Sequence, residues 1–123
     1  MVKDFRQLDV WQKSHQLALV LYRATAGFPM EERFGLRAQI RRAAVSVPAN
    51  ISEGCGRHSD AEFARFCIVA SGSASELEYH LLLARELRLL PPLQHEQLTA
   101  RVTEIKRMLT GLVQTLAEGR SGD

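Results

Sequence analysis

The chain has 123 residues, of which 46% are hydrophobic and 24% are charged, and its formal net charge is +2. This length fits one domain, and the composition is that of an ordinary globular protein, which excludes the disordered and fibrous classes. No run approaches the roughly 18 consecutive apolar residues that a membrane span needs, and the opening MVKDFRQLDVW lacks the apolar core of a signal peptide. We therefore expect a cytoplasmic protein with no membrane association.

The first two predicted helices cover about residues 8–26 and 32–54, where apolar side chains recur every three or four positions. The GFP stretch at 27–29 ends the first, since glycine favours the position after a helix and proline cannot continue one. In the second, the stripe expected to face the core comprises Leu36, Ile40, Ala43 and Val47.

The third predicted helix covers about residues 60–90, from the capping box formed by Ser59 and Glu62 to the prolines at 91 and 92. The fourth covers about residues 94–117, and its apolar residues alternate steps of four and three, as in a coiled-coil seam. A disordered tail is expected at 118–123. Because long helices with short connections pack as antiparallel neighbours, the sequence predicts an all-α, up-and-down four-helix bundle as one domain over residues 1–123.

The third helix carries more apolar surface than one bundle can cover. The stripe expected to face the core comprises Phe63, Cys67, Ala70, Ala74, Leu77 and Leu81. Other sides of the helical wheel carry Ile68, Tyr79, Leu82 and Leu83. We expect these four residues to contact another copy in a ring-like homo-oligomer, where the small residues ASGSAS at 70–75 allow close approach. The alternative is the scatter of exposed apolar side chains that every protein has.

The second helix also holds a proline, an amide and a carboxylate where a regular apolar stripe would continue. Pro48 removes one backbone hydrogen bond and is expected to kink the helix on a side away from the core stripe. Asn50 lies near that stripe and is expected to bond to Ser73 or to the backbone that the proline frees. Glu53 is expected to pair with Arg57 one turn on. These expectations give the residues structural roles, the alternative being a catalytic role for Glu53.

Several stretches resemble one bacterial family in the same order along the chain. They are FRQLDVWQKSHQLA at 5–18, ERFGL at 32–36, IRRAAVSVPANISEGCGR at 40–57 and FARFCIVASGSASELEYHLLLA at 63–84. They resemble the four-helix-bundle proteins encoded within intervening sequences of 23S ribosomal RNA genes, and they are similar to the accessory protein of diversity-generating retroelements. The resemblance implies a cytosolic homopentamer and, through the retroelement protein, association with nucleic acid. Cys55 departs from the family pattern, in which an aromatic residue is more usual.

Of the 16 basic residues, 13 are arginine. Several of these arginines lie along the second helix or just after it, and they form the candidate nucleic-acid site. Its residues are Arg33, Arg37 and Arg41 at steps of four, Arg42 beside them and Arg57 at the far end. Such a ridge favours a compensating anion, either phosphate of RNA or DNA or a carboxylate of the same or another subunit. The first reading predicts a nucleic-acid-binding module, and the second predicts a pure protein scaffold. The net charge of +2 is too small to decide between them.

An enzyme is the third reading, and the spacings argue against it. No histidine has glutamate three positions before it, as di-metal bundles require, although Glu76 and His80 stand one helical turn apart. Arg88 and His95 match an RNA-cleaving spacing but are separated by two prolines. Cys55 and Cys67 have no zinc-like spacing. We therefore predict no catalytic residue, metal, cofactor or small-molecule substrate; the remote alternative is a metal-carboxylate bundle enzyme.

Overall fold

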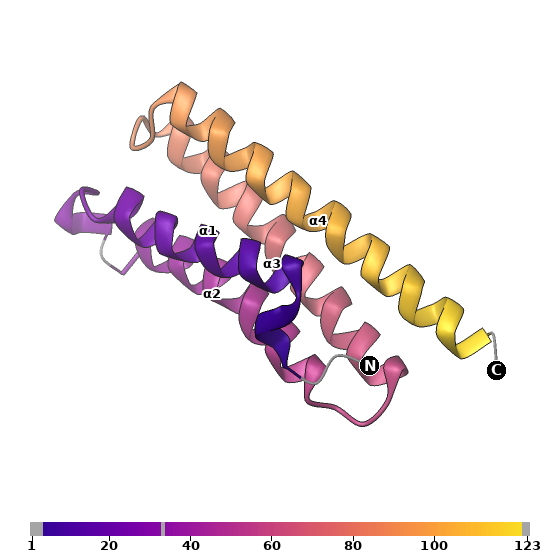
Figure 1. Cartoon of the computed structure of the whole chain (residues 1–123). Helices are drawn as coiled ribbons and strands as arrows, with labels where there is room; N and C mark the ends of the chain where they lie inside the picture. The colour runs from indigo at the N-terminus through magenta and orange to yellow at the C-terminus, as the bar shows by residue number, and fades with distance from the viewer. Residues whose placement is uncertain (1–3, 33, 122–123) are drawn as a thin grey trace.

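Four long antiparallel helices make up most of the computed structural model, which describes residues 4–32 and 34–121 (Figure 1). They are α1 (Asp9–Thr25), α2 (Leu36–Cys55), α3 (Asp60–Glu86) and α4 (Pro92–Ser121), with the short 3-10 helices η1 (Phe5–Gln7) and η2 (Met30–Glu32). α3 packs against both α2 and α4, whereas α1 packs mainly against α2. No strand occurs in the described ranges, so the all-α four-helix prediction is confirmed.

The apolar stripes predicted for α2 and α3 are buried in the core. All ten of their residues are at most 7% exposed, and Ile40, Cys67 and Ala70 are completely buried. In α4 the seam is buried at Leu98, Val102, Ile105, Leu109 and Leu116, whereas Leu112 is only partly buried. Burying each leucine, isoleucine or valine contributes about 1.5–3 kcal/mol, so these stripes are the main source of stability.

The start of α2 differs from the prediction. The helix begins at Leu36 and not near residue 32, because η2 occupies 30–32 and the chain turns at Gly35. Glu32 Oε1 accepts a hydrogen bond of 2.9 Å from the Leu36 backbone N–H. The Glu32 side chain thus caps α2, satisfying a donor that the first helical turn leaves without an intrahelical acceptor.

The end of α3 also differs, because Arg88 takes a left-handed backbone conformation with φ 62°. The Leu89 N–H donates to the Ala84 carbonyl and the Arg88 N–H to the Arg85 carbonyl, each at 2.9 Å. This pair of bonds is a Schellman motif, which stops the helix at Glu86 and not near residue 90. Glycine usually occupies the left-handed position of that motif, so the sequence carries no visible stop signal before the two prolines.

α4 is longer at both ends than the predicted segment 94–117. It starts at Pro92, which suits the first position of a helix because the missing N–H is not needed there. It ends at Ser121, so it extends into the segment predicted to be a disordered tail. Residues 122 and 123 lie outside the described residues.

Pro48 lies inside α2, which continues to Cys55, and its side chain is buried. Pro48 is therefore buried although the helical wheel places it on a side away from the stripe that starts at Leu36. α2 packs against both α1 and α3, so its buried sector is wider than the stripe that starts at Leu36, and it includes the side that carries Pro48. Ser52 Oγ donates to the Pro48 carbonyl oxygen at 2.8 Å, which gives this oxygen a second partner within the helix.

Gly54, in the last turn of α2, allows a close approach to α3. A Cβ atom at this position would lie 2.7 Å from Phe66 Cβ, 3.0 Å from Phe63 Cδ1 and 3.3 Å from the Phe63 carbonyl oxygen. Real Cβ atoms do not come within 3.0 Å of such neighbours, so the spacing of α2 and α3 at this end depends on a residue without a side chain.

Candidate functional site

Arg41 of the predicted ridge is held by α1. Its Nε donates to Thr25 Oγ1 and its Nη2 donates to the Tyr22 carbonyl oxygen, both at 2.9 Å. The guanidinium lies 4.5 Å from the centre of the Tyr22 ring. Thr25 is 1% exposed, so Arg41 donates to a hydroxyl that water scarcely reaches, whereas its bond to the Tyr22 carbonyl is exposed. These two bonds tie α2 to α1.

Arg42 and Arg57 are also paired inside the chain. Arg42 Nη2 donates to Glu76 Oε2 at 3.0 Å and to Gln39 Oε1. Arg57 Nη2 lies 3.1 Å from Glu53 Oε1, the pairing expected from their spacing. Arg37 is half-buried and makes no ion pair with the residues that the structure describes. Arg33 lies outside the described residues. Of the five arginines of the ridge, Arg42 and Arg57 are therefore neutralised by carboxylates within the chain.

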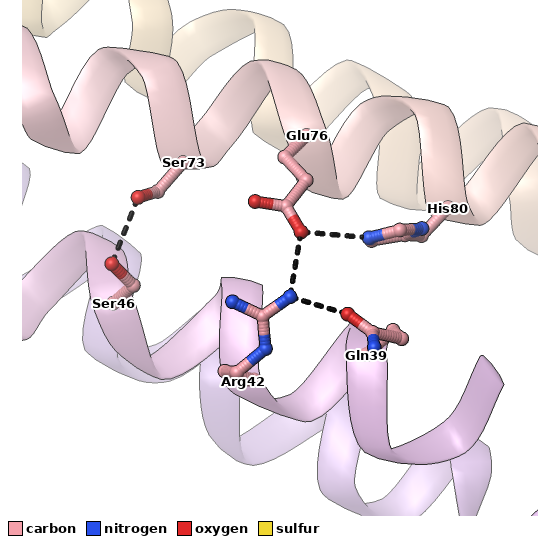
Figure 2. A network of polar contacts seen from close by, with 6 residues as sticks. All are labelled: Gln39, Arg42, Ser46, Ser73, Glu76 and His80. Atoms are coloured by element: carbon pink, nitrogen blue, oxygen red, sulfur yellow. Dashed lines mark hydrogen bonds and ion pairs between the residues drawn. The ribbon is translucent and has the colours of Figure 1, made fainter. Parts of the chain in front are cut away.

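A row of polar side chains links α2 to α3 (Figure 2). Ser46 and Ser73 share a hydrogen bond of 2.8 Å between their hydroxyl oxygens. Asn50 Nδ2 donates to the Ser46 carbonyl at 2.8 Å and to Ser46 Oγ at 3.0 Å. Asn50 thus reaches Ser73 through Ser46 and not directly, and sequence reasoning did not identify Ser46. Its only signal is its position one helical turn before Asn50.

Glu76 joins Arg42 to His80 at the other end of this row (Figure 2). His80 Nε2 lies 2.9 Å from Glu76 Oε2, while His80 Nδ1 is buried without a hydrogen-bond partner in the described structure. The hydrogen bond from His80, and then the nearby Arg42 charge, lower the pKa of the Glu76 carboxyl although partial burial opposes them. A carboxylate held in this way stays ionised at neutral pH, so it is a poor general acid and serves to connect the two helices.

Large apolar side chains are exposed on the sides of α3 that face away from the core. This outer face of α3 comprises Ile68 (59% exposed), Val69 (45%), Tyr79 (59%), Leu82 (38%) and Leu87 (54%). Leu83, the remaining predicted interface residue, is only partly buried and packs against the core. α3 thus presents apolar side chains both to the core and to its outer side.

A groove runs beside this face, between α3 and α4. One part is a hollow of about 380 Å³, lined by Ile68, Ser71, Gly72, Ser75, Leu109, Thr110, Val113 and Gln114. A second part of about 330 Å³ includes Ser75, Tyr79 and Leu82. No atom lies within 4 Å of a Cβ built on Gly72. Of the small residues in the middle of α3, Ser71, Gly72 and Ser75 therefore line this hollow.

Residues 4–32 and 34–121 contain no group of three or more His, Cys, Asp or Glu side chains placed to hold a metal ion. Across the same part of the chain, every helix falls short of the length and apolar content that crossing a bilayer requires. Both cysteines are buried, and burial raises the pKa of the Cys67 thiol to about 12. Such a thiol is protonated at neutral pH and unsuited to nucleophilic chemistry.

Comparison with known proteins identifies relatives of this fold. Residues 6–111 match the family described as 23S rRNA-intervening sequence protein. The chain is similar to a crystal structure of a protein of unknown function from the S23 ribosomal protein family of Bacteroides thetaiotaomicron VPI-5482. The two share 28% identity with a TM-score of 0.76, over 85% of this chain and 97% of the other. No protein with curated annotation is similar enough to count as a match.

Proposed function

Because the chain belongs to the 23S rRNA-intervening sequence protein family, we propose that it is a non-enzymatic module that acts as a homo-oligomer. The observation that carries this proposal is the outer face of α3, where Ile68 and Tyr79 are each 59% exposed. Large apolar side chains exposed in this way favour an interaction site. The groove between α3 and α4 lies beside it and offers room for side chains of another copy.

A ring, with five members as the family resemblance implies, requires two different faces on each subunit. The outer face of α3 is one of them. A second set of exposed apolar side chains lies on α1 and α2: Leu19 (37% exposed), Tyr22 (43%) and Val45 (42%). Contact between unlike faces repeats around an axis until the ring closes, whereas one face paired with itself would give a dimer.

Sedimentation equilibrium of the purified protein tests this proposal. Ile68→Glu and Leu82→Glu place a charge on the outer face of α3 and are expected to yield folded monomers. Leu93→Glu is the matched control, because Leu93 is 66% exposed at the start of α4 and lies outside that face. A wild-type protein that stays monomeric across the micromolar range contradicts the proposal, as do Ile68→Glu and Leu82→Glu variants that remain oligomeric.

Nucleic-acid binding is a second candidate function, and the surplus of unpaired arginines favours it. Arg37, Arg65, Arg85 and Arg88 make no ion pair with the described residues, in contrast to Arg42 and Arg57. Several copies in one ring would multiply weak phosphate contacts into useful avidity. These contacts would be sequence-tolerant, since arginine reads the phosphate backbone by charge and geometry.

Fluorescence anisotropy with nuclease-treated protein, labelled structured RNA and labelled duplex DNA tests this second function. Binding through phosphates weakens as salt rises, by a log–log slope of about 0.7 to 0.9 for each contact. An affinity that does not change with salt concentration, or no binding at low salt, contradicts the nucleic-acid function. Neither result affects the self-association proposal, which is measured separately.

A further inference from the structure

We propose that the connection between α3 and α4 is a phosphate-binding site in which Arg85 and Arg88 hold the anion. Both arginines line a hollow of about 640 Å³, together with Glu86 and the segment 89–92. This volume falls within the roughly 300–1,000 Å³ of small-ligand sites. The hollow lies at the connection between α3 and α4, which stands at one end of the bundle (Figure 1).

The charges at the hollow are not neutralised within the chain. Arg85 and Arg88 are exposed, and neither makes an ion pair with a described carboxylate, although Glu86 lines the same hollow. A phosphate group has several acceptor oxygens and can take charge-assisted hydrogen bonds from two guanidinium groups at once. By contrast, the guanidinium of Arg41 on α2 already donates two hydrogen bonds to α1.

The backbone of Arg88 supports a role for its side chain. Within residues 4–32 and 34–121, Arg88 is the only non-glycine residue with a positive φ, at 62°. The left-handed conformation costs an L-amino acid roughly 1–2 kcal/mol, and glycine avoids this cost. A stop signal alone would be better served by glycine, so the arginine places a guanidinium on the hollow in spite of its backbone cost.

The N-terminal end of α4 adds to the positive potential at the same place. Pro91 and Pro92 line the hollow, and the first turn of α4 contains no acidic side chain. The positive end of the helix dipole therefore faces the hollow without a neighbouring carboxylate on that turn. An anion bound by the two arginines gains from this field as well.

The phosphate has two possible sources, a nucleic-acid backbone and a free phosphate compound. Binding of a nucleic-acid backbone rests on the proposed nucleic-acid function, whereas binding of a free phosphate compound does not. Inorganic phosphate and pyrophosphate, measured by titration calorimetry at constant ionic strength, probe the free form. A labelled short single-stranded RNA, measured by anisotropy, probes the backbone form.

Two variants remove the arginines with little effect on the fold. Arg88→Gly keeps the left-handed backbone, and Arg85→Gln replaces an exposed side chain in the last turn of α3. Arg107→Gln is the matched control: it removes one exposed charge from the middle of α4. We expect each of the first two variants to weaken binding of the responding probe about ten-fold. For RNA, the salt slope should also fall by about 0.7 per variant.

Loss in Arg88→Gly and Arg85→Gln, with less than a two-fold change in Arg107→Gln, supports the site. Loss of RNA binding assigns it to nucleic acid, whereas loss confined to the inorganic probes assigns it to a free phosphate compound. Equal losses in all three variants overturn the site, because charge alone then explains binding. If Arg88→Gly changes binding of neither the RNA nor the inorganic probes, the site is overturned while the nucleic-acid function stands. If the wild-type protein binds neither RNA nor the inorganic probes, the phosphate site and the nucleic-acid function are both refuted, and the self-association proposal is unaffected.

Discussion

Replacing Gly54 by alanine should separate α2 from α3 and destabilise the bundle. The added methyl group would lie 2.7 Å from Phe66 Cβ and 3.3 Å from the Phe63 carbonyl oxygen. Both of these atoms belong to the backbone or are attached directly to it, so no side-chain rotation can relieve the overlap. The two helices must therefore move apart in the region where Phe63 is buried.

The magnitude follows from two opposing effects. Overpacking of this kind costs about 1–3 kcal/mol. Alanine gains up to about 1 kcal/mol over glycine in a helix interior, and less in a last turn. The free energy of unfolding of Gly54→Ala should thus fall by about 1–2 kcal/mol, which for a domain of this size lowers Tm by roughly 4–8 °C.

Urea and thermal unfolding followed by circular dichroism measure this change, at a protein concentration where all variants have the same oligomeric state. Gly111→Ala is the matched control, since no atom lies within 4 Å of a Cβ at that position of α4. It should raise the free energy of unfolding by about 0.5–1 kcal/mol through helix propensity alone. If Gly54→Ala is as stable as the control, the close approach of α2 and α3 does not constrain this position and the reasoning is refuted.

Three further changes test other parts of the structure. Burial raises the pKa of the Cys67 thiol from 9.0 to about 12. The contribution of this thiol to the free energy of unfolding is therefore intact below pH 9. It is lost as pH rises toward about 12, by up to ~1.4 kcal/mol per pH unit. Urea unfolding of Cys67→Ala should therefore be less sensitive to pH in that window; curves parallel to wild type contradict this. Arg41→Gln should lower the free energy of unfolding by about 1–3 kcal/mol because the hydroxyl of buried Thr25 on α1 loses its donor, whereas Arg37→Gln should change it little. Gly72→Ala should stabilise the subunit by about 0.5–1 kcal/mol yet weaken self-association in sedimentation experiments, and a variant that assembles as well as wild type places Gly72 outside the interface.

The core could be predicted from the sequence because the apolar stripes repeat within single helices. Leu36 and Ile40, or Phe63 and Cys67, are neighbours on one face whatever the other helices do, and all four are buried. The helix ends were less predictable. α3 stops at a left-handed arginine in place of glycine, and α2 starts where the Glu32 side chain replaces a backbone acceptor. Propensity rules that rely on residue type miss both.

Polar contacts within a short stretch of chain could also be predicted from the sequence, whereas those between helices could not. Glu76 and His80 lie one turn apart in α3, and Glu53 and Arg57 have the same spacing across the end of α2, so spacing alone brings each pair together. The bonds from Arg41 to α1 and from Ser46 to Ser73 depend on how two helices are rotated against each other. That rotation is decided by the packing of whole faces. Arginines that the sequence predicts to form a surface site can therefore bond to a neighbouring helix, as Arg41 and Arg42 do.

The order of the helices has a consequence for how quickly the chain folds. α1 packs mainly on α2, α2 on α3 and α3 on α4, so most contacts join segments that follow each other along the chain. Little loop-closure entropy is lost before such contacts form, and helical bundles with local contacts fold in microseconds to milliseconds. Encounters between folded subunits slow down on dilution, whereas folding within one chain does not. For the proposed homo-oligomer, the meeting of subunits would therefore be the slow step of assembly in dilute solution.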